Sequence, residues 1–449
     1  MTATAPPNPR APTPNVRAVA TRRRTTELGL LVLVAIVVLS AYALASLGRN
    51  ASLPADIVPF LGVVLVLLLV AHLAVRRWAA AADPLILPLV AFLNGIGFVF
   101  IARLDEQLAG LQATWTGVGI AAFVVTLLVV RDVRVLQRYR YTFGLIGVLL
   151  LLMPLLPVFG RNINGARIWV AFGPVSFQPG EFAKIALAIF FAGYLVERRE
   201  VLGVATFRVG PFNTPDPRQF APVLVAWGVS LLVVVFERDL GSALLFFLLF
   251  IITLWVATGR AAYLVTGFLL FGVGAVISWS MFSHVQDRVS IWLNPWADPS
   301  GSGYQIIQAA YALAWGGTTG VGPGLGIVDR IPFDETDFIV AIIGEELGLL
   351  GTTAILVAFL LLAGSGLRIA KGAGATFGTL LAVGLTSLVA FQAFIIMAGV
   401  TRLLPLTGVT LPFVSYGGSS LVANYVLVAL LLRISDQSIR RAPDPLAAL

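Results

Sequence analysis

One carboxylate is a candidate for chemistry because of its place between two apolar runs. Asp239 follows Arg238, and the runs at 219–236 and 240–257 leave almost no loop around it. Apolar surroundings would raise the pKa of this carboxylate, and Arg238 would lower it. Two roles are open: a general base held near a membrane surface, or an N-cap of the helix that begins at Leu240.

A second candidate is a pair of opposite charges at a predicted helix start. Glu181 and Lys184 follow Pro179 and Gly180 and lie three residues apart, so they share one helix face. They could simply form an ion pair. A lysine in the first helical turn opposes the helix dipole, however, so an anionic ligand such as a phosphate would also explain its place.

Two adjacent acidic residues lie inside a later apolar run. Glu345 and Glu346 follow Asp337 by about two helical turns, or roughly 12 Å. Adjacent residues on a helix point about 100° apart, so at most one of the two is expected to face a given cavity. The alternative is that both make hydrogen bonds to neighbouring helices.

Small and hydroxyl-bearing residues gather near the end of the chain. Ser415 and Ser419 lie in the stretch 411–420, with Asn424 one turn further on. Such residues are common where helices pack in lipid. The proline and paired glycines of the same stretch also suit an irregular helix start that lines a cavity.

The composition places all these residues in a membrane protein. Hydrophobic residues make up 58% of the chain, charged residues only 12%, and the mean hydropathy is +0.94. The absence of cysteine excludes disulfides, thiolate metal sites and a catalytic cysteine. The two histidines, His72 and His284, are far apart, which disfavours a histidine-based metal site.

Apolar windows predict an all-α polytopic fold of twelve spans. A disordered cytoplasmic tail at 1–26 precedes two spans within 27–80, a core at 81–433 with an outer loop at 283–337, and a tail at 434–449. The predicted spans are 28–47, 56–75, 84–102, 112–130, 142–159, 181–196, 219–236, 240–257, 262–282, 338–362, 376–399 and 413–432.

The distribution of basic residues predicts the orientation. If the N-terminus is cytoplasmic, 21 of the 30 Arg and Lys residues fall on cytoplasmic segments and 8 on outer segments. The positive-inside rule therefore places both termini in the cytoplasm and Asp239 on the outer side. The net charge of +8 then reflects cytoplasmic loops rather than nucleic-acid binding.

Two outer segments are long enough to suggest function, namely 160–180 and 283–337. The longer one contains 304–315, which is predicted to be a helix that lies along the membrane surface or dips into it. Six glycines between Gly316 and Gly326 then predict a flexible connector.

Several motifs together resemble the RodA/FtsW family of shape, elongation, division and sporulation proteins. The two added N-terminal spans, Leu93-Asn94-Gly95 and 160–163 look more like the actinobacterial RodA branch than the FtsW branch. The motifs are Asn164-Gly165-Ala166-Arg167-Ile168-Trp169, Phe177-Gln178-Pro179-Gly180-Glu181-Phe182-Ala183-Lys184, Asp239-Leu240-Gly241, Gly303-Tyr304-Gln305 with Gln308, Thr336-Asp337-Phe338, Gly344-Glu345-Glu346-Leu347-Gly348 and the block from Pro412 to Asn424.

The resemblance implies a peptidoglycan polymerase that uses lipid II on the outer face of the bacterial plasma membrane, in cell elongation and shape. It implies that Asp239 is the catalytic carboxylate and that a class B penicillin-binding protein is the partner. The further residues that it implies in substrate binding are Arg167, Glu181, Lys184, Arg288, Tyr304, Gln305, Gln308, Asp337, Glu345, Glu346, Ser415, Ser419 and Asn424.

Polymerisation needs a base for the attacking hydroxyl and positive charge for the departing diphosphate. We expect Asp239 to be the base, and Lys184, Arg167, Arg288 or a divalent cation, Mg²⁺ or Mn²⁺, to neutralise the diphosphate. A lipid II flippase or transporter, a division polymerase of the FtsW type and a noncatalytic scaffold are the alternatives.

Overall fold

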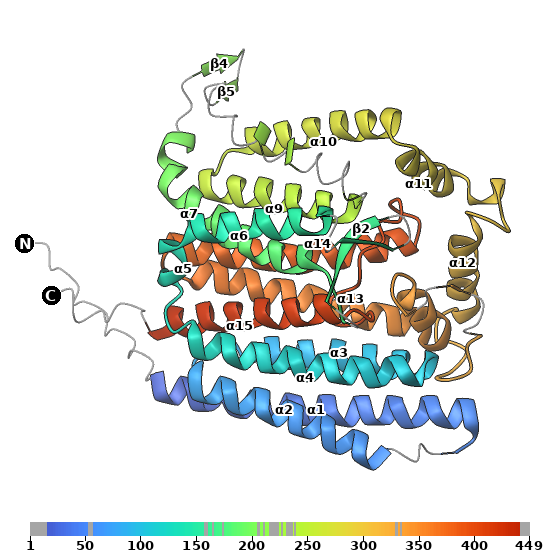
Figure 1. Ribbon diagram of the computed structural model, residues 1–449. Helices are drawn as coiled ribbons and strands as arrows, with labels where there is room; N and C mark the ends of the chain where they lie inside the picture. The colour runs from blue at the N-terminus through green and yellow to red at the C-terminus, as the bar shows by residue number, and fades with distance from the viewer. Residues whose placement is uncertain are drawn as a thin grey trace, which may run out of the picture.

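The fold is a bundle of long helices that lie side by side (Figure 1). This computed structural model describes residues 16–52, 57–156, 160–163, 166–172, 175–203, 207–209, 212–214, 224–225, 228–229, 237, 239–327, 331–332 and 335–440. The predicted fold class, an all-α polytopic membrane protein, is confirmed.

The elements follow one another in an almost wholly helical order. The helices are α1 (Val16–Asn50), α2 (Ile57–Trp78), α3 (Ile86–Leu104), α4 (Glu106–Val129), α5 (Arg134–Arg138), α6 (Arg140–Leu152), η1 (Met153–Leu155), α7 (Pro179–Gly203), α9 (Leu240–Thr258), α10 (Ala261–Met281), α11 (Ser283–Leu293), η3 (Pro295–Ala297), α12 (Tyr304–Gly316), α13 (Ile339–Gly372), α14 (Thr376–Val400) and α15 (Gly418–Arg440). The strands are β1 (Gly160–Ile163), β2 (Ala166–Phe172), β3 (Val175–Phe177), β4 (Phe207–Val209) and β5 (Phe212–Thr214).

Nine helices of the described part of the chain are long and apolar enough to cross a membrane: α1, α3, α4, α7, α9, α10, α13, α14 and α15. The predicted spans at 56–75 and 142–159 correspond to α2 and to the shorter apolar helix of α6 and η1. The predicted span at 219–236 lies largely outside the described residues. The total of twelve therefore stays a prediction.

Burial separates central helices from peripheral ones. The apolar windows of α14 and α15 are 78% and 89% buried, whereas those of α1 and α10 are 22% buried. Figure 1 accordingly shows α1 with α2 at one edge of the bundle and α10 at the opposite edge. The exposed faces of the edge helices are apolar, as a lipid environment requires.

The first turn of α1 and the last turn of α15 lie at the same end of the bundle, opposite α11 and α12 (Figure 1). At this end, the boundaries between tails and helices differ from those predicted from the sequence. Helix α1 begins at Val16 and α15 ends at Arg440, so the tails predicted at 1–26 and 434–449 are partly helical.

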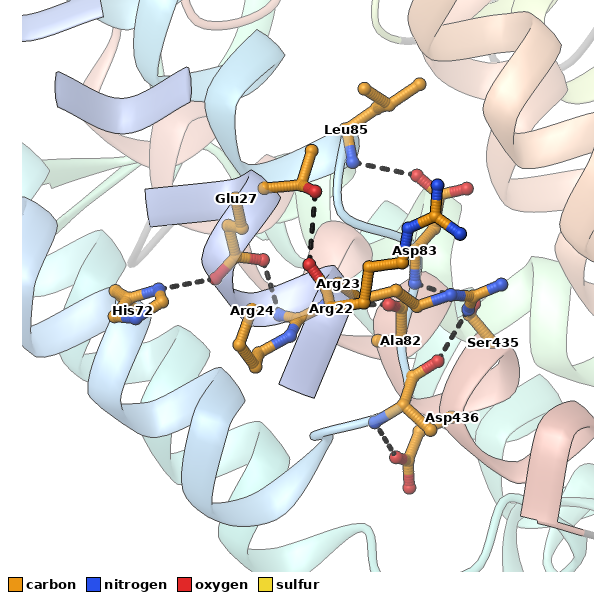
Figure 2. A network of polar contacts seen from close by, with 12 residues as sticks. Arg22, Arg23, Arg24, Glu27, His72, Ala82, Asp83, Leu85, Ser435 and Asp436 are labelled. Carbon is orange, nitrogen blue, oxygen red and sulfur yellow. Dashed lines mark hydrogen bonds and ion pairs between the residues drawn. The ribbon is translucent and has the colours of Figure 1, made fainter. Parts of the chain in front are cut away.

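Buried polar contacts explain why these helices extend so far (Figure 2). Arg24 is ion-paired with Glu27 and donates to the carbonyl of Ala82 at 2.6 Å. The other oxygen of Glu27 lies 2.7 Å from Nδ1 of His72, on α2. Asp436, on α15, accepts from the backbone N–H of Ala81 at 2.8 Å. These contacts tie α1, α2 and α15 to the turn before α3.

The strands form two small antiparallel sheets. Strands β1, β2 and β3 form one sheet in which Gly160 pairs with Val170 and Phe172 with Val175. Because β3 leads directly into α7, the sheet lies at the predicted outer end and places β2 beside the start of α7. The hairpin of β4 and β5 lies at the other end (Figure 1).

Helix α13 is interrupted at Gly348, whose φ of 65° and ψ of −162° are not helical. The glycine-rich loop, residues 316–327, supplies partners for the backbone groups that the break leaves free. The N–H groups of Val321 and Gly322 donate to the carbonyls of Glu345 and Glu346, and those of Leu349 and Leu350 donate to the carbonyls of Gly317 and Thr318, at 2.9 to 3.2 Å. The expectation of a flexible connector is therefore wrong.

Candidate active site

A polar cavity of about 450 Å³ lies at the outer-loop end of the bundle. Its wall comes from β2, from the starts of α7 and α9, and from helices α11 and α12. The segment before α13 and the segment after α14 complete it. The lining residues are Ile168, Trp169, Gln178, Glu181, Asp239, Arg288, Ile291, Ser302, Gln305, Ile306, Thr336, Asp337, Phe338, Leu406, Gly408, Val409 and Thr410.

Asp239 both caps α9 and faces this cavity. One carboxylate oxygen accepts from the N–H of Ser242 at 2.9 Å and the other accepts from its hydroxyl at 2.6 Å. Asp239 can therefore serve as the N-cap of α9 and as a general base at the same time. An ionised carboxylate has about four lone-pair positions, so two remain for a proton donor in the cavity.

The approach of the segment 406–410 to Asp239 depends on a small neighbour. A Cβ on Gly241 would lie 2.0 Å from Cγ2 of Val409. Any larger side chain would therefore push this part of the wall away from the start of α9.

Arg288 and Asp337 both line the cavity and both lie close to Gly408. A Cβ on Gly408 would be 3.5 Å from a guanidinium nitrogen of Arg288 and 3.8 Å from a carboxylate oxygen of Asp337. Arg288 also donates to the carbonyl of Leu406 at 2.7 Å. One positive side chain, Arg288, and three carboxylates, Glu181, Asp239 and Asp337, thus face the same cavity.

Burial raises the pKa of Asp337 to about 6; Arg288 opposes the rise, and the carboxylates of Asp239 and Glu335 add to it. The folded protein therefore holds this proton more tightly than the unfolded chain, whose carboxyl titrates near 3.8. Ionisation costs folded stability as the pH rises from about 4 to 6, and the full cost remains above pH 6.

We expect Asp337→Asn to remove this cost. Above pH 6 the variant should be more stable than the parent by about 2 to 3 kcal/mol, and near pH 4 the two should be equal. Thermal unfolding in detergent without divalent cations measures the difference. Asp287→Asn, on the exposed part of α11, is the control. A difference that does not change with pH would contradict the prediction.

Glu181 and Lys184 form an ion pair, one of the two alternatives that the sequence left open, with Glu181 at the wall of the cavity. Nζ of Lys184 lies 2.8 Å from Glu181 and donates to the side-chain oxygen of Gln392 at 2.8 Å. The amide of Gln392 donates to the carbonyl of Thr410 at 2.8 Å. Glu181 and Thr410 line the cavity but Lys184 does not, so a ligand would reach the Lys184 charge through Glu181.

The other predicted residues divide into two groups. Gln305 lines the cavity and donates to the carbonyl of Pro332 at 3.3 Å. The residues outside the lining are Arg167, which is exposed on β2, Tyr304 and Gln308 on α12, and Ser415, Ser419 and Asn424. Their roles in substrate binding stay predictions.

Ser415 and Ser419 support the wall from behind. Ser415 donates to the carbonyl of Thr336 at 2.6 Å and accepts from the N–H of Leu411 at 2.9 Å. The hydroxyl of Ser419 accepts from the N–H of Gln178 at 3.0 Å. Both serines therefore position backbone next to residues that do face the cavity.

Glu345 and Glu346 hold the glycine-rich loop and do not line the cavity. Glu346 accepts from the N–H of Gly324 at 2.7 Å and pairs with Arg103 at 3.3 Å. Glu345 accepts from the N–H of Ile327 at 3.2 Å. Their predicted role in substrate binding has no contact to support it, because both carboxylates are occupied by the loop.

An apolar groove of about 350 Å³ adjoins the cavity. Its walls are α9, α10, α11 and α14 with the segment 404–407, and it shares Arg288 with the cavity. Trp292 and Arg402 fasten this side: the indole N–H donates to the carbonyl of Arg402 at 3.0 Å, and Arg402 donates back to that of Trp292 at 3.1 Å. A lipid chain in the groove would bring its headgroup to Arg288.

Sequence reasoning missed part of the wall. Ser302, Gly408 and Val409 line the cavity, yet no motif pointed to them. The left-handed backbone at Arg402 and Gly408, with φ of 59° and 73°, turns their segment back over α9. Glycine at 408 was the one available signal, because it often marks such a turn.

Comparisons with known proteins all point to one family. Residues 84–440 match the family of FtsW, RodA and SpoVE cell cycle proteins. The peptidoglycan glycosyltransferase RodA of Mycobacterium tuberculosis is 45% identical over 424 residues, which cover 92% of this chain and 90% of that protein.

Solved structures agree on the fold. A structure described as a peptidoglycan synthase complex that coordinates polymerization and crosslinking has a TM-score of 0.66 and 27% identity, covering 80% of this chain and 98% of that chain. The rod shape determining protein RodA of Thermus thermophilus has a TM-score of 0.57 and 26% identity, covering 81% and 99%.

Proposed function

Because this chain belongs to the family of FtsW, RodA and SpoVE cell cycle proteins, we propose that it is a peptidoglycan glycosyltransferase of cell elongation. Its substrate is lipid II, the polyprenyl diphosphate that carries a disaccharide peptide. The relative from Mycobacterium tuberculosis, with 45% identity, is a peptidoglycan glycosyltransferase by name.

The observation that carries this proposal is the position of Asp239. Its carboxylate is 7% exposed and faces a polar cavity that also holds Arg288. Glycosyl transfer from a diphosphate needs a base for the attacking hydroxyl and a cation for the leaving group, and here a base and a cation face the same cavity.

The reaction assigns a step to each group. Asp239 accepts the proton of the attacking 4-hydroxyl, whose oxygen forms a bond to the anomeric carbon of the second sugar. The bond between that carbon and the diphosphate breaks, and the lipid diphosphate leaves with the electron pair. Arg288 stabilises its negative charge, while Lys184 offsets the negative charge of Glu181 on the cavity wall.

The cavity also fits a divalent cation, though only one that is shared with the substrate. No group of three or more metal-ligating side chains occurs among the residues that the structure describes. Mg²⁺ is often held by one or two carboxylates together with phosphates. Asp337 is the carboxylate that would hold the ion, which supplies positive charge at the diphosphate.

The apolar groove supports a lipid-linked substrate. It has room for part of a polyprenyl chain, and Arg288 lies where the groove meets the cavity. A lipid chain in the groove and a sugar in the cavity would place the diphosphate between them, beside the guanidinium.

The site is proposed to lie on the outer face of the bacterial plasma membrane, with both termini in the cytoplasm. The end where α1 begins carries the predicted cytoplasmic arginines, among them Arg22, Arg23 and Arg24. A class B penicillin-binding protein is the proposed partner, because the structural relative belongs to a complex that combines polymerization with crosslinking.

The proposal is tested with the full chain in liposomes, supplied with purified fluorescent lipid II. Glycan strands should form, with a higher yield when the penicillin-binding partner is added, and gel electrophoresis measures them. A flippase would instead move lipid II across the bilayer without polymer. Absence of polymer under all conditions would overturn the proposal.

Removal of divalent cations is a separate prediction. We expect chelation with EDTA to lower the polymer yield at least about tenfold, because a departing diphosphate is then neutralised by Arg288 alone. Added Mg²⁺ or Mn²⁺ should restore it. A yield that EDTA leaves unchanged would show that protein cations suffice.

A further inference from the structure

The two N-terminal helices lie outside the part of the chain that matches the family, which begins at residue 84. They are nevertheless fixed to the core, α2 at one end and α1 at both ends. At one end, the Arg24, Glu27 and His72 contacts join α1 and α2 to the turn before α3 (Figure 2). At the other end, α1 meets the glycine-rich loop.

The contact between α1 and this loop is backbone against backbone. A Cβ on Gly48 would lie 2.1 Å from the carbonyl oxygen of Pro323, and a Cβ on Gly324 would lie 2.1 Å from that of Ala45. Arg49 also donates to the carbonyl of Arg103 at 3.0 Å. Only glycine at both positions permits so close an approach.

The same stretch of the loop is held from its other side. Arg103 donates to the carbonyls of Gly324 and Gly326, each at 3.0 Å, and Glu346 accepts from the N–H of Gly324. Gly324 is thus enclosed by α1, α3 and α13. If α1 moved away, this part of the loop would keep two of its three supports.

The loop touches two elements that carry the wall of the cavity. It follows directly on α12, whose Gln305 faces the cavity. It also bonds Glu345 and Glu346 of α13, a helix that begins two residues after Asp337. The N–H of Tyr416 donates to the carbonyl of Glu335 at 2.8 Å. A shift of the loop would therefore be transmitted to groups that face the substrate.

We propose that the outer end of α1 is a positioning element of the polymerase, which holds the glycine-rich loop and thereby sets the place of the cavity wall that carries Gln305 and Asp337. The two added helices would then serve catalysis rather than membrane anchoring alone. This inference rests on the proposed function for its rate measurements.

Two substitutions of glycine in the same helix provide the test. Gly48→Leu inserts a side chain against Pro323, whereas Gly29→Leu places the same side chain where nothing lies within 4 Å. Leucine is a better helix former than glycine, so neither change weakens α1 itself. Polymerisation of lipid II and deuterium uptake of the peptides over 316–327 are measured for both full-length variants.

We expect kcat of Gly48→Leu to fall roughly 10- to 100-fold, since small displacements of catalytic geometry have effects of that size. KM should change much less, because the groove does not touch α1. Deuterium uptake over 316–327 should rise, with the unfolding temperature close to that of Gly29→Leu. Equal rates and equal uptake in the two variants would overturn the inference.

If Gly48→Leu does not fold, a second pair of variants with smaller structural changes tests the inference. Arg49→Gln removes the bond to Arg103, and Arg77→Gln, at the exposed end of α2, is its control. A roughly two- to tenfold lower kcat than in the control is expected from the loss of one hydrogen bond. Equal kcat would overturn the inference. Failure of the parent protein to polymerise lipid II would refute the proposed function alone, because deuterium uptake still tests the contact.

Discussion

Asp239→Asn is expected to abolish polymer formation, with a rate loss of roughly 10²- to 10⁴-fold, because an amide cannot accept the proton of the attacking hydroxyl. The variant should remain folded. Asparagine caps helices about as well as aspartate, and its oxygen can still accept from the N–H of Ser242. Polymerisation of lipid II and thermal unfolding measure the two properties separately.

A matched control exists elsewhere in the chain. Asp105 caps α4 by accepting from the N–H groups of Gln107 and Leu108, and it lies outside the cavity. Asp105→Asn should therefore leave the rate unchanged. Asp239→Ala should lose the rate and, in addition, about 1 kcal/mol of stability with the cap. Normal polymer yield from Asp239→Asn would refute its role as the base.

Gly348→Ala is expected to have the largest effect on stability. The backbone of Gly348 lies in a region open almost only to glycine, and a Cβ there would be 2.3 Å from the nitrogen of Gly320 and 2.7 Å from the carbonyl oxygen of Thr318. Strain and clash together should cost about 3 kcal/mol or more and displace the glycine-rich loop.

The control for this change lies in the same helix. Gly364 has nothing within 4 Å of the position of a Cβ, so Gly364→Ala should be neutral or slightly stabilising. Thermal unfolding and deuterium uptake over 316–327 compare the two variants. If Gly348→Ala were as stable as Gly364→Ala, the break in α13 would not be needed to hold the loop.

The sequence was sufficient to predict the parts of the molecule that depend on local chemistry. Apolar length predicted the spanning helices. The spacing of Glu181 and Lys184 placed them on one helix face, where an ion pair was one of two alternatives, and they form this pair at 2.8 Å. The helix cap at Asp239 was likewise visible from its position before an apolar run.

Features that depend on contacts between distant segments could not be predicted. Helix α1 begins at Val16, inside the tail predicted at 1–26, and Arg24 in this part of the helix bonds the distant carbonyl of Ala82. The break at Gly348 follows Glu345 and Glu346 inside an otherwise apolar run, and its partners come from a loop about thirty residues away. For Glu345 and Glu346 the sequence left two roles open, in substrate binding or in hydrogen bonds to neighbouring segments, and nothing local indicates the loop N–H groups that they bind.

The break in α13 also fixes the depth at which the reaction can occur. Below it, residues 349–372 form a helix about 36 Å long at roughly 1.5 Å per residue, enough to cross a hydrocarbon layer of about 30 Å. Residues 339–347 and Asp337 before them are then free to lie among the lipid headgroups. Under the proposed function, such an enzyme would meet a lipid-linked sugar at the level where the sugar already rests, so the substrate would not have to leave its leaflet to react.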